Sequence, residues 1–325
     1  MFSKFLTVVS IMGIGLVAVD FDSLPRLQPN QADAVAANKS PSDYNHDLAA
    51  ILPADAELEQ IAEGFQFTEG PVWHPEGFLL FSDIPANTIY KWQPGDTTEI
   101  FRQPSGNANG NALDNSGRLV SAEHGNRRLS LTQKNGEIVT LASQYQGKSL
   151  NSPNDMTIKS DGSIYFTDPP YGISSEEEEL GFYGVYRLAQ DGTLTLLADD
   201  FVRPNGIALS PDESKLYVND SQEGHIRVFD VQPDGTLTNG QLFAPLKPPG
   251  KTGAADGMKV DTQGNIYSTA PGGVWIFSPD GKLLGIIATP KPATNIAWGD
   301  RNYQTLYITA RGSVYRIPLK IPGIP

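Results

Sequence analysis

The chain has 325 residues, of which 39% are hydrophobic, contains no cysteine and carries a formal net charge of −13. The lack of cysteine excludes disulfides, a thiolate nucleophile, a thiolate zinc cage and a lipid-modified cysteine. The acidic balance, without a basic stripe, disfavours nucleic acid as a partner and suits a cation site.

The N-terminal segment differs from the rest of the chain. Lys4 precedes an apolar stretch from Phe5 to Val19, and small residues follow at Ala32-Asp-Ala-Val-Ala-Ala37. This order is typical of a secretory signal, so residues 1–37 are interpreted as a signal peptide, with an uncleaved membrane anchor as the alternative. Residues 38–57 are interpreted as a polar linker. We therefore expect a periplasmic or secreted protein, with a membrane-anchored one as the second choice.

Six later segments begin alike, with a small polar or acidic residue leading into a short apolar strand. Their lead residues are Glu69, Asn109, Asn154, Asn205, Asp256 and Thr294. The spacings between these residues are 40, 45, 51, 51 and 38, which is the period of a four-stranded propeller blade. The spacing therefore predicts six blades.

The interior of each unit has β character. A turn rich in Asp, Asn and Gly, such as Asp114-Asn-Ser-Gly, follows the first strand and leads into a second, and most units continue with a third, such as Val274-Trp-Ile-Phe. Residues 58–325 are therefore predicted to be one all-β domain, a six-bladed β-propeller with four-stranded blades around a central channel. A closed propeller needs no partner to cover its sheet edges, so we expect a monomer.

Four lead residues form the candidate metal site. Because equivalent positions of successive blades converge on the axis, Glu69, Asn154, Asn205 and Asp256 are expected to point at one spot. Two carboxylates and two amide oxygens make a hard site suited to Ca²⁺, or to Mg²⁺ or Mn²⁺ with more water. Local turn capping by Asn and Asp is the alternative for any one of these residues. Four potential ligands in register across four blades favour the metal site.

Several motifs also carry a family resemblance. They are Glu69-Gly-Pro-Val-Trp, Phe81-Ser-Asp-Ile-Pro, Glu123-His-Gly-Asn-Arg-Arg, Ser152-Pro-Asn-Asp, Phe166-Thr-Asp-Pro-Pro-Tyr-Gly, Arg203-Pro-Asn-Gly and Ala255-Asp-Gly-Met. Together they resemble the bacterial gluconolactonase branch of the family that also holds senescence marker protein (regucalcin) and luciferin-regenerating enzyme. The resemblance covers nearly all of the chain after the linker.

The resemblance implies one divalent cation held at Glu69, Asn154, Asn205 and Asp256, with Ca²⁺ first and Mg²⁺, Mn²⁺ or Zn²⁺ as alternatives. It also implies hydrolysis of sugar lactones such as gluconolactone, with a metal-polarised carbonyl and Asp256 as general base. Direct attack by Asp256 through an acyl-enzyme is the mechanistic alternative. The related diisopropyl-fluorophosphatase has a similar ligand set, so other esterase or phosphotriesterase chemistry stays open. A non-catalytic propeller that binds a small ligand or Ca²⁺ is the third hypothesis.

A second group of residues is expected around the substrate. The second strands should end on the face where the first begin, which places Asp83, Glu123, Asp168 and Asp220 near the channel mouth. The candidates for substrate contact are Asn109, His124, Asp168, Tyr171 and Ser152. A bond within its own turn is the alternative for His124, and turn formation is the alternative for Asp168. Animal members of the family have an arginine where this chain has Ser152, so sugar recognition is expected to differ.

Overall fold

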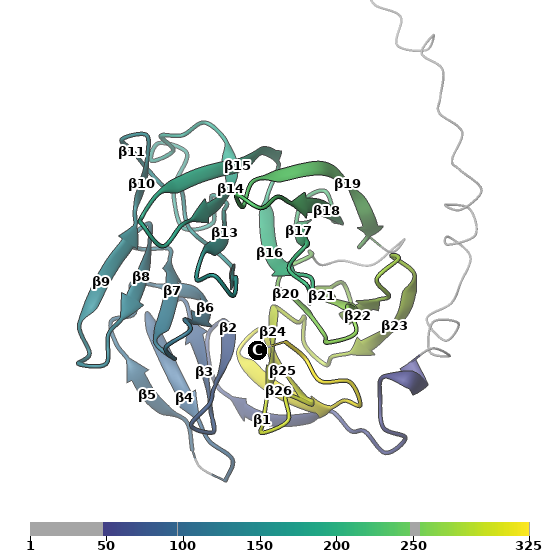
Figure 1. The fold of residues 1–325 in the computed structure, drawn as a ribbon. Coiled ribbons are helices and arrows are strands. Elements are labelled where there is room, and N and C mark those ends of the chain that lie inside the picture. The colour runs from purple at the N-terminus through teal and green to yellow at the C-terminus, as the bar shows by residue number, and fades with distance from the viewer. Residues whose placement is uncertain (1–47, 96, 248–253, 325) are drawn as a thin grey trace, which may run out of the picture. The chain divides into compact units, whose positions relative to one another are not determined.

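The computed structural model describes residues 48–95, 97–247 and 254–324. In this part of the chain six antiparallel four-stranded sheets follow one another around a central axis, as Figure 1 shows. The predicted all-β class and the six-bladed β-propeller are confirmed. The expected signal peptide, residues 1–37, lies outside the described residues.

The first three blades are built in chain order from the innermost strand to the outermost. Their strands are β2 (Thr68–His74), β3 (Phe78–Asp83), β4 (Thr88–Trp92) and β5 (Glu99–Arg102); β6 (Ala108–Leu113), β7 (Leu119–Glu123), β8 (Arg128–Thr132) and β9 (Ile138–Ala142); and β12 (Met156–Ile158), β13 (Ile164–Asp168), β14 (Tyr183–Leu188) and β15 (Leu194–Phe201). A two-stranded ribbon, β10 (Gln144–Tyr145) and β11 (Lys148–Ser149), stands between blades two and three.

Blades four and five repeat this order, and blade six departs from it. Their strands are β16 (Pro204–Leu209), β17 (Lys215–Asp220), β18 (His225–Val231) and β19 (Leu237–Pro245); β20 (Met258–Val260), β21 (Ile266–Ala270), β22 (Gly273–Phe277) and β23 (Leu283–Ala288); and β24 (Asn295–Gly299), β25 (Thr305–Ala310), β26 (Ser313–Pro318) and β1 (Glu59–Glu63).

Blade six takes its outermost strand from the start of the domain. β1 pairs antiparallel with β26, with Glu59 opposite Arg316 and Glu63 opposite Ser313. The Arg316 Nε also donates to Glu59 Oε2 at 2.7 Å. The two ends of the repeat array therefore join in one sheet, which closes the ring.

Aromatic and branched side chains fill the spaces between blades. Tyr165, Tyr186, Tyr267 and Tyr307 are among the largest fully buried side chains. The rings of Trp73 and Tyr307, from blades one and six, stack with centroids 5.2 Å apart. The predicted hairpin turns form as expected, with Gly117 at φ +73° and Gly264 at φ +82°, conformations that cost glycine little. The core is therefore a ring of blade-to-blade contacts around the channel.

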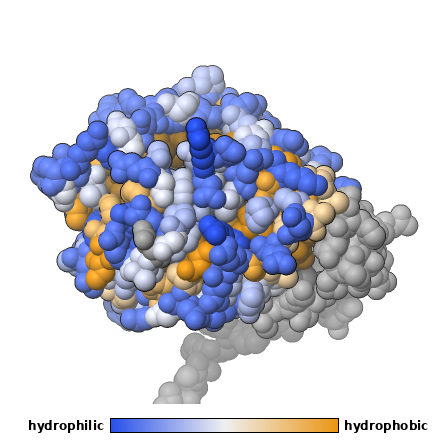
Figure 2. Space-filling model, turned by 90° about the horizontal axis from the view of Figure 1, so that it is seen from below, coloured by the Kyte–Doolittle hydropathy of each residue, from blue (hydrophilic) through white to orange (hydrophobic). Residues whose placement is uncertain are grey.

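The last part of the expected linker lies against the propeller. A short 3₁₀-helix, η3 (Leu48–Ala50), precedes β1, and Leu48 and Ile51 are buried in the cluster that includes Ile287 and Leu319. In the described ranges, no helix is both long and apolar enough to span a membrane. Hydrophilic side chains cover most of the face in Figure 2, with hydrophobic ones in separate patches between them.

Candidate active site in the central channel

The six lead residues lie where the innermost strands begin, and they are linked from blade to blade through their backbones. The Gly110 amide donates to the Asn154 carbonyl at 2.8 Å, and the Gly206 amide donates to the Asp256 carbonyl at 3.0 Å. The Thr167 hydroxyl donates to the Asn205 carbonyl at 2.8 Å. Since each carbonyl is held by a neighbouring blade, the lead residues are fixed in one ring at this end of the channel.

Glycine follows the lead residue in four blades because the blades approach closely there. A Cβ on Gly206 would overlap the Asp256 carbonyl oxygen, and one on Gly110 would overlap the Asn154 carbonyl oxygen. Blades three and six carry Asp155 and Asn295 at this position instead. These two polar residues are therefore exceptions that call for an explanation.

Glu69 is buried, with only 2% of its surface exposed. Its Oε2 accepts from the Gly70 amide at 2.6 Å and from Asn295 Nδ2 at 2.9 Å, whereas its Oε1 has no hydrogen-bond partner among the described residues. Burial, and then the Asp155 carboxylate, raise the pKa of Glu69 to about 7. One oxygen of this carboxylate is thus fixed and the other is available to a ligand.

Asn205 and Asp256 come together with Glu69. Asn205 Nδ2 donates to Ser221 Oγ at 3.0 Å, and the buried Asn205 Oδ1 lacks a partner within the described ranges. Burial, then the Glu69 charge, raise the pKa of Asp256 well above its usual range, against a hydrogen bond from Asn205. The structure therefore brings three of the four predicted ligands into contact or close electrostatic interaction.

Asn154, the fourth, lies in the same ring and is 3% exposed. Its amide donates to the Thr167 carbonyl at 2.9 Å, so its backbone is held between blades two and three. Its side chain makes no hydrogen bond to the described residues. The placement of Asn154 fits the predicted ligand set, while its side chain stays outside the Glu69–Asp256 contacts.

The donor set fits a hard divalent cation. Buried oxygens without partners cost roughly 1–3 kcal/mol each, and here Glu69 Oε1, Asn205 Oδ1 and Asn109 Oδ1 are all in this condition. The Glu69 and Asp256 carboxylates also repel each other, which a cation between them would relieve. No group of three or more His, Cys, Asp or Glu side chains arranged for a metal occurs in the described part of the chain, and the predicted set has only two carboxylates.

His124 and Asn109, two candidates for substrate contact, bind each other. Asn109 Nδ2 lies 3.1 Å from His124 Nε2. An amide NH₂ only donates, so Nε2 accepts and the neutral ring carries its proton on Nδ1. Burial lowers the pKa of His124 to about 4, and the ring is therefore neutral at ordinary pH.

Ser152 and Tyr171 belong to one loop arrangement beside this pair. Ser152 Oγ accepts from the Gly172 amide at 2.9 Å, and a Cβ on Gly172 would come within 2.5 Å of that oxygen and 2.7 Å of His124 Cβ. Tyr171, next in the loop, is 39% exposed and lies under the Arg203 guanidinium, 5.6 Å from its ring centroid. The pKa of the Tyr171 hydroxyl is raised. Burial is the largest cause and the Asp256 charge adds to it, while hydrogen bonds with Ser221 and Asn205 act in the opposite direction. Tyr171 therefore forms a wall beside Asn205 and Asp256.

Asp168 holds the loop before Asn154. Its Oδ2 accepts from the Asn151 amide at 2.8 Å and its Oδ1 from the Ser152 amide at 2.7 Å, and the residue is fully buried. Burial raises the pKa of Asp168 to about 7 against these two bonds. Both oxygens thus hold a loop 16 and 17 residues earlier in the chain, rather than the turn of Asp168 itself, and substrate contact by Asp168 remains a prediction.

The other expected mouth carboxylates also hold backbone. Asp83 accepts from the amides of Gln66 and Phe67 at 2.9 and 3.1 Å, and Asp220 accepts from those of Val202 and Arg203 at 2.8 and 3.0 Å. Each carboxylate therefore orients the segment that leads into the innermost strand of its own blade.

Glu123 is held by basic side chains instead. It accepts from Arg128 Nε at 2.7 Å and forms an ion pair with Arg102, and none of the glutamate side chain is exposed.

Sequence reasoning missed the residues beneath the site. Asn295 Nδ2, bound to Glu69, also lies 3.4 Å from Asp155 Oδ2. Asp155 Oδ1 accepts from the Met156 amide at 2.8 Å and lies 3.8 Å from Lys259 Nζ. Burial raises the pKa of Asp155, opposed by the Lys259 charge. The departure from glycine after the lead residue was the signal that could have identified Asp155 and Asn295.

Comparison with known proteins places this chain in a family. Residues 67–312 match the family model described as the SMP-30/Gluconolactonase/LRE-like region. The gluconolactonase of Zymomonas mobilis is 39% identical over 306 residues, covering 85% of both chains.

Two solved structures are also similar to this chain. A gluconolactonase from Xanthomonas campestris superposes with a TM-score of 0.78 at 38% identity, covering 85% of this chain and 93% of that one. The calcium-binding protein regucalcin from Agrobacterium tumefaciens, at 19% identity with a TM-score of 0.71 and coverage of 82% and 95%, shares the fold. The resemblance carried by the motifs is confirmed: the chain belongs to the SMP-30/gluconolactonase/LRE-like family.

Proposed function

We propose that this protein is a divalent-cation-dependent lactonase that opens sugar lactones of the gluconolactone type. The observation that carries the proposal is the meeting of two repelling carboxylates with buried oxygens that have no partner. The gluconolactonase relatives, similar over most of this chain, support lactones as the substrate class.

Glu69, Asn154, Asn205 and Asp256 would hold the cation. When bound, such an ion polarises a lactone carbonyl and stabilises negative charge on its oxygen. Glu69 is set for this task by Asn295, and Asn205 by Ser221, since each of those bonds leaves one oxygen free. Oxygen donors suit Ca²⁺, Mg²⁺ and Mn²⁺, and Ca²⁺ is the ion that we propose first.

Asp256 is the proposed general base. Burial and the Glu69 charge raise its pKa without a cation, and a bound cation would lower that pKa. A lactone is an activated ester, so a weak carboxylate base at the channel would be sufficient. It would take a proton from the water that attacks the lactone. Tyr171, the His124–Asn109 pair and the loop on Ser152 would enclose the sugar.

We also propose that the protein is periplasmic or secreted, with residues 1–37 as its signal peptide. The charged start, the apolar stretch and the small residues of the sequence support this.

The test is chelation followed by add-back. The protein is stripped with EDTA, and Ca²⁺, Mg²⁺, Mn²⁺ and Zn²⁺ are returned singly while acid release from sugar lactones, aryl esters and a fluorophosphate is followed against the spontaneous rate. We expect lactone hydrolysis to be lost and then restored, best by Ca²⁺. If no cation restores hydrolysis of any substrate, the protein is a non-catalytic binding propeller. If hydrolysis is restored only with the fluorophosphate, the substrate class is an organophosphate and not a lactone.

A further inference from the structure

A cavity occupies the other end of the channel. Its volume is about 410 Å³. Residues at or near the ends of all six innermost strands line it, which are Trp73, Leu113, Ile158, Leu209, Val260 and Trp298. The lead residues stand where the same strands begin, so this cavity lies away from the Glu69 site. Its volume is within the range of small-molecule sites, roughly 300–1,000 Å³.

The lining combines apolar walls with polar and charged side chains, and its charges are held in different ways. Three charged residues line the cavity, namely Asp114, Glu213 and Lys259. Asp114 is paired with Arg118 at 2.6 Å, and Glu213 with Lys159 at 2.9 Å. Both acids are therefore neutralised by cations of their own.

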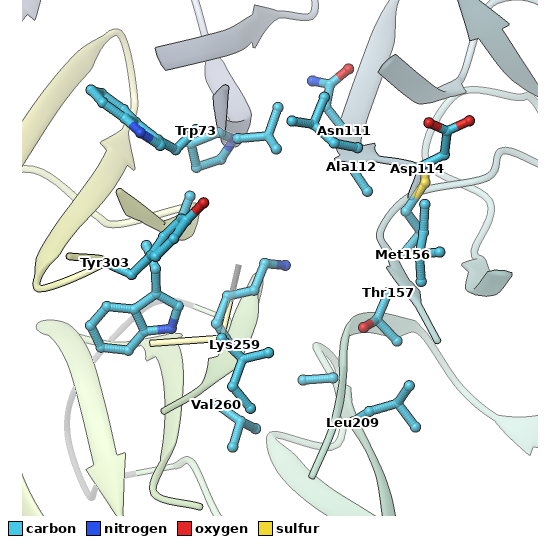
Figure 3. A pocket seen from close by; sticks show the side chains of 18 of the residues that line it. Trp73, Asn111, Ala112, Asp114, Met156, Thr157, Leu209, Lys259, Val260 and Tyr303 are labelled. Atoms are coloured by element: carbon cyan, nitrogen blue, oxygen red, sulfur yellow. The ribbon is translucent and has the colours of Figure 1, made fainter. Parts of the chain in front are cut away.

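Lys259 is ion-paired with Asp155, but over a longer distance than the other two pairs. Its Nζ lies 3.8 Å from Asp155 Oδ1, an oxygen that already accepts from the Met156 amide, and it makes no hydrogen bond within the ranges the structure describes. Figure 3 shows the lysine side chain directed into the space between Trp73 and Tyr303 on one side and Met156 and Thr157 on the other. The ammonium is thus held by charge rather than by a hydrogen bond, which leaves N–H groups to donate to a ligand.

Trp298 supplies a second unmatched donor. It lines the same cavity, is 2% exposed, and its indole Nε1 has no acceptor in the described residues. A buried N–H without a partner is costly, and an acceptor in the cavity would remove that cost.

We propose that this cavity binds a small monocarboxylate with an aromatic or branched aliphatic body. The carboxylate would accept from Lys259, with Trp298 as the additional donor, and the apolar body would contact Trp73, Leu209 and Tyr303. A single charge fits because Lys259 is the one basic side chain among the lining residues, and an aromatic or branched body fits against the Trp73, Trp298 and Leu209 side chains.

The test uses 4-methylbenzoate as probe and 4-methylbenzamide as its uncharged control, with binding measured by calorimetry on the full chain. We expect saturable binding of the carboxylate only. Lys259→Met, which keeps the stem and removes the charge, should weaken binding about tenfold or more, while Lys259→Arg should retain most of it. Trp298→Phe should weaken binding severalfold.

Two further measurements separate this cavity from the Glu69 site. Binding should persist after EDTA treatment and in Asp256→Asn. In wild-type crystals soaked with 4-bromobenzoate, the anomalous bromine peak should lie in the cavity, a result that does not depend on any variant folding. The proposal is overturned by absence of binding, by equal binding in Lys259→Met, by loss of binding on chelation, or by a bromine peak elsewhere only.

Discussion

Asn295 Nδ2 lies 2.9 Å from Glu69 Oε2, although the two residues are 226 positions apart. The Ile296 amide donates to Asn295 Oδ1 at 2.8 Å, which keeps the amide NH₂ turned toward the glutamate. The contact crosses from blade six to blade one. Asn295 therefore sets the orientation of the carboxylate whose other oxygen is free.

Replacing this amide should weaken cation binding. In Asn295→Leu, Glu69 loses one of its two donors and its orientation, so we expect the dissociation constant for Ca²⁺ to rise about 10- to 100-fold, as for other residues that orient metal ligands. Titration calorimetry measures it. Asn135→Ala, at an exposed turn, is the control and should bind as the wild type does. Unchanged affinity in Asn295→Leu would remove the orienting role.

Removing the proposed base should stop turnover without unfolding the protein. Asp256→Asn keeps the shape and takes away the proton acceptor, so kcat should fall by about 10²- to 10⁴-fold. Circular dichroism and thermal melting check that the propeller persists. Asp199→Asn, on the exposed edge strand β15, is the matched control. Full activity in Asp256→Asn would refute the assignment.

His124 should contribute to loss of stability in acid. Burial lowers its pKa to about 4 in the folded protein, from an ordinary value near 6.5. The unfolded chain therefore binds more protons in this window, and stability falls as the pH drops from about 6.5 toward 4. The maximum slope for one proton is about 1.4 kcal/mol per pH unit.

Urea unfolding of wild type and His124→Gln across pH 4–8 isolates this contribution. Glu69 and Asp168 titrate with raised pKa values and act in the opposite direction, but both are present in both proteins and cancel in the difference. The difference in unfolding free energy should change with pH below about 6.5 and stay flat above it. A difference that is flat throughout would contradict the buried neutral ring.

Tyr171 should affect substrate binding more than stability. The side chain is 39% exposed and stands beside Asn205 and Asp256, so Tyr171→Ala should raise KM severalfold with little change in the melting temperature. Tyr171→Phe separates the ring from the hydroxyl: a KM close to that of the wild type assigns the effect to the ring. Steady-state kinetics of lactone opening provide both values. Equal KM values in all three proteins would remove Tyr171 from the substrate wall.

Local sequence patterns predicted the features that repeat. The spacing of Glu69, Asn109, Asn154, Asn205, Asp256 and Thr294 gave the six blades, because each blade is one local unit of strands and turns. The same periodicity placed Glu69, Asn205 and Asp256 together. Asp83 and Asp220 stand at strand ends, as expected, but their oxygens bind backbone amides, which residue type alone does not reveal.

Features that depend on the closed ring were not predictable in this way. Asn295 and Asp155 approach each other from blades six and three, across the channel, and nothing in either segment specifies the other. Lys259 lies three residues after Asp256, in a short strand whose sequence gives no sign of a binding site. The pairing of β1 with β26 was missed for the same reason, since it joins segments about as distant as the chain allows.

That pairing imposes an order of events on synthesis. Glu59 emerges from the ribosome long before Arg316, the residue opposite it, and the sixth sheet stays incomplete until β26 is made. The nascent protein must therefore spend most of its synthesis as an open arc of blades, in which β1 lacks the strand that it pairs with in the folded protein. We therefore expect the nascent chain to become resistant to protease late and abruptly, once β26 is available to pair with β1.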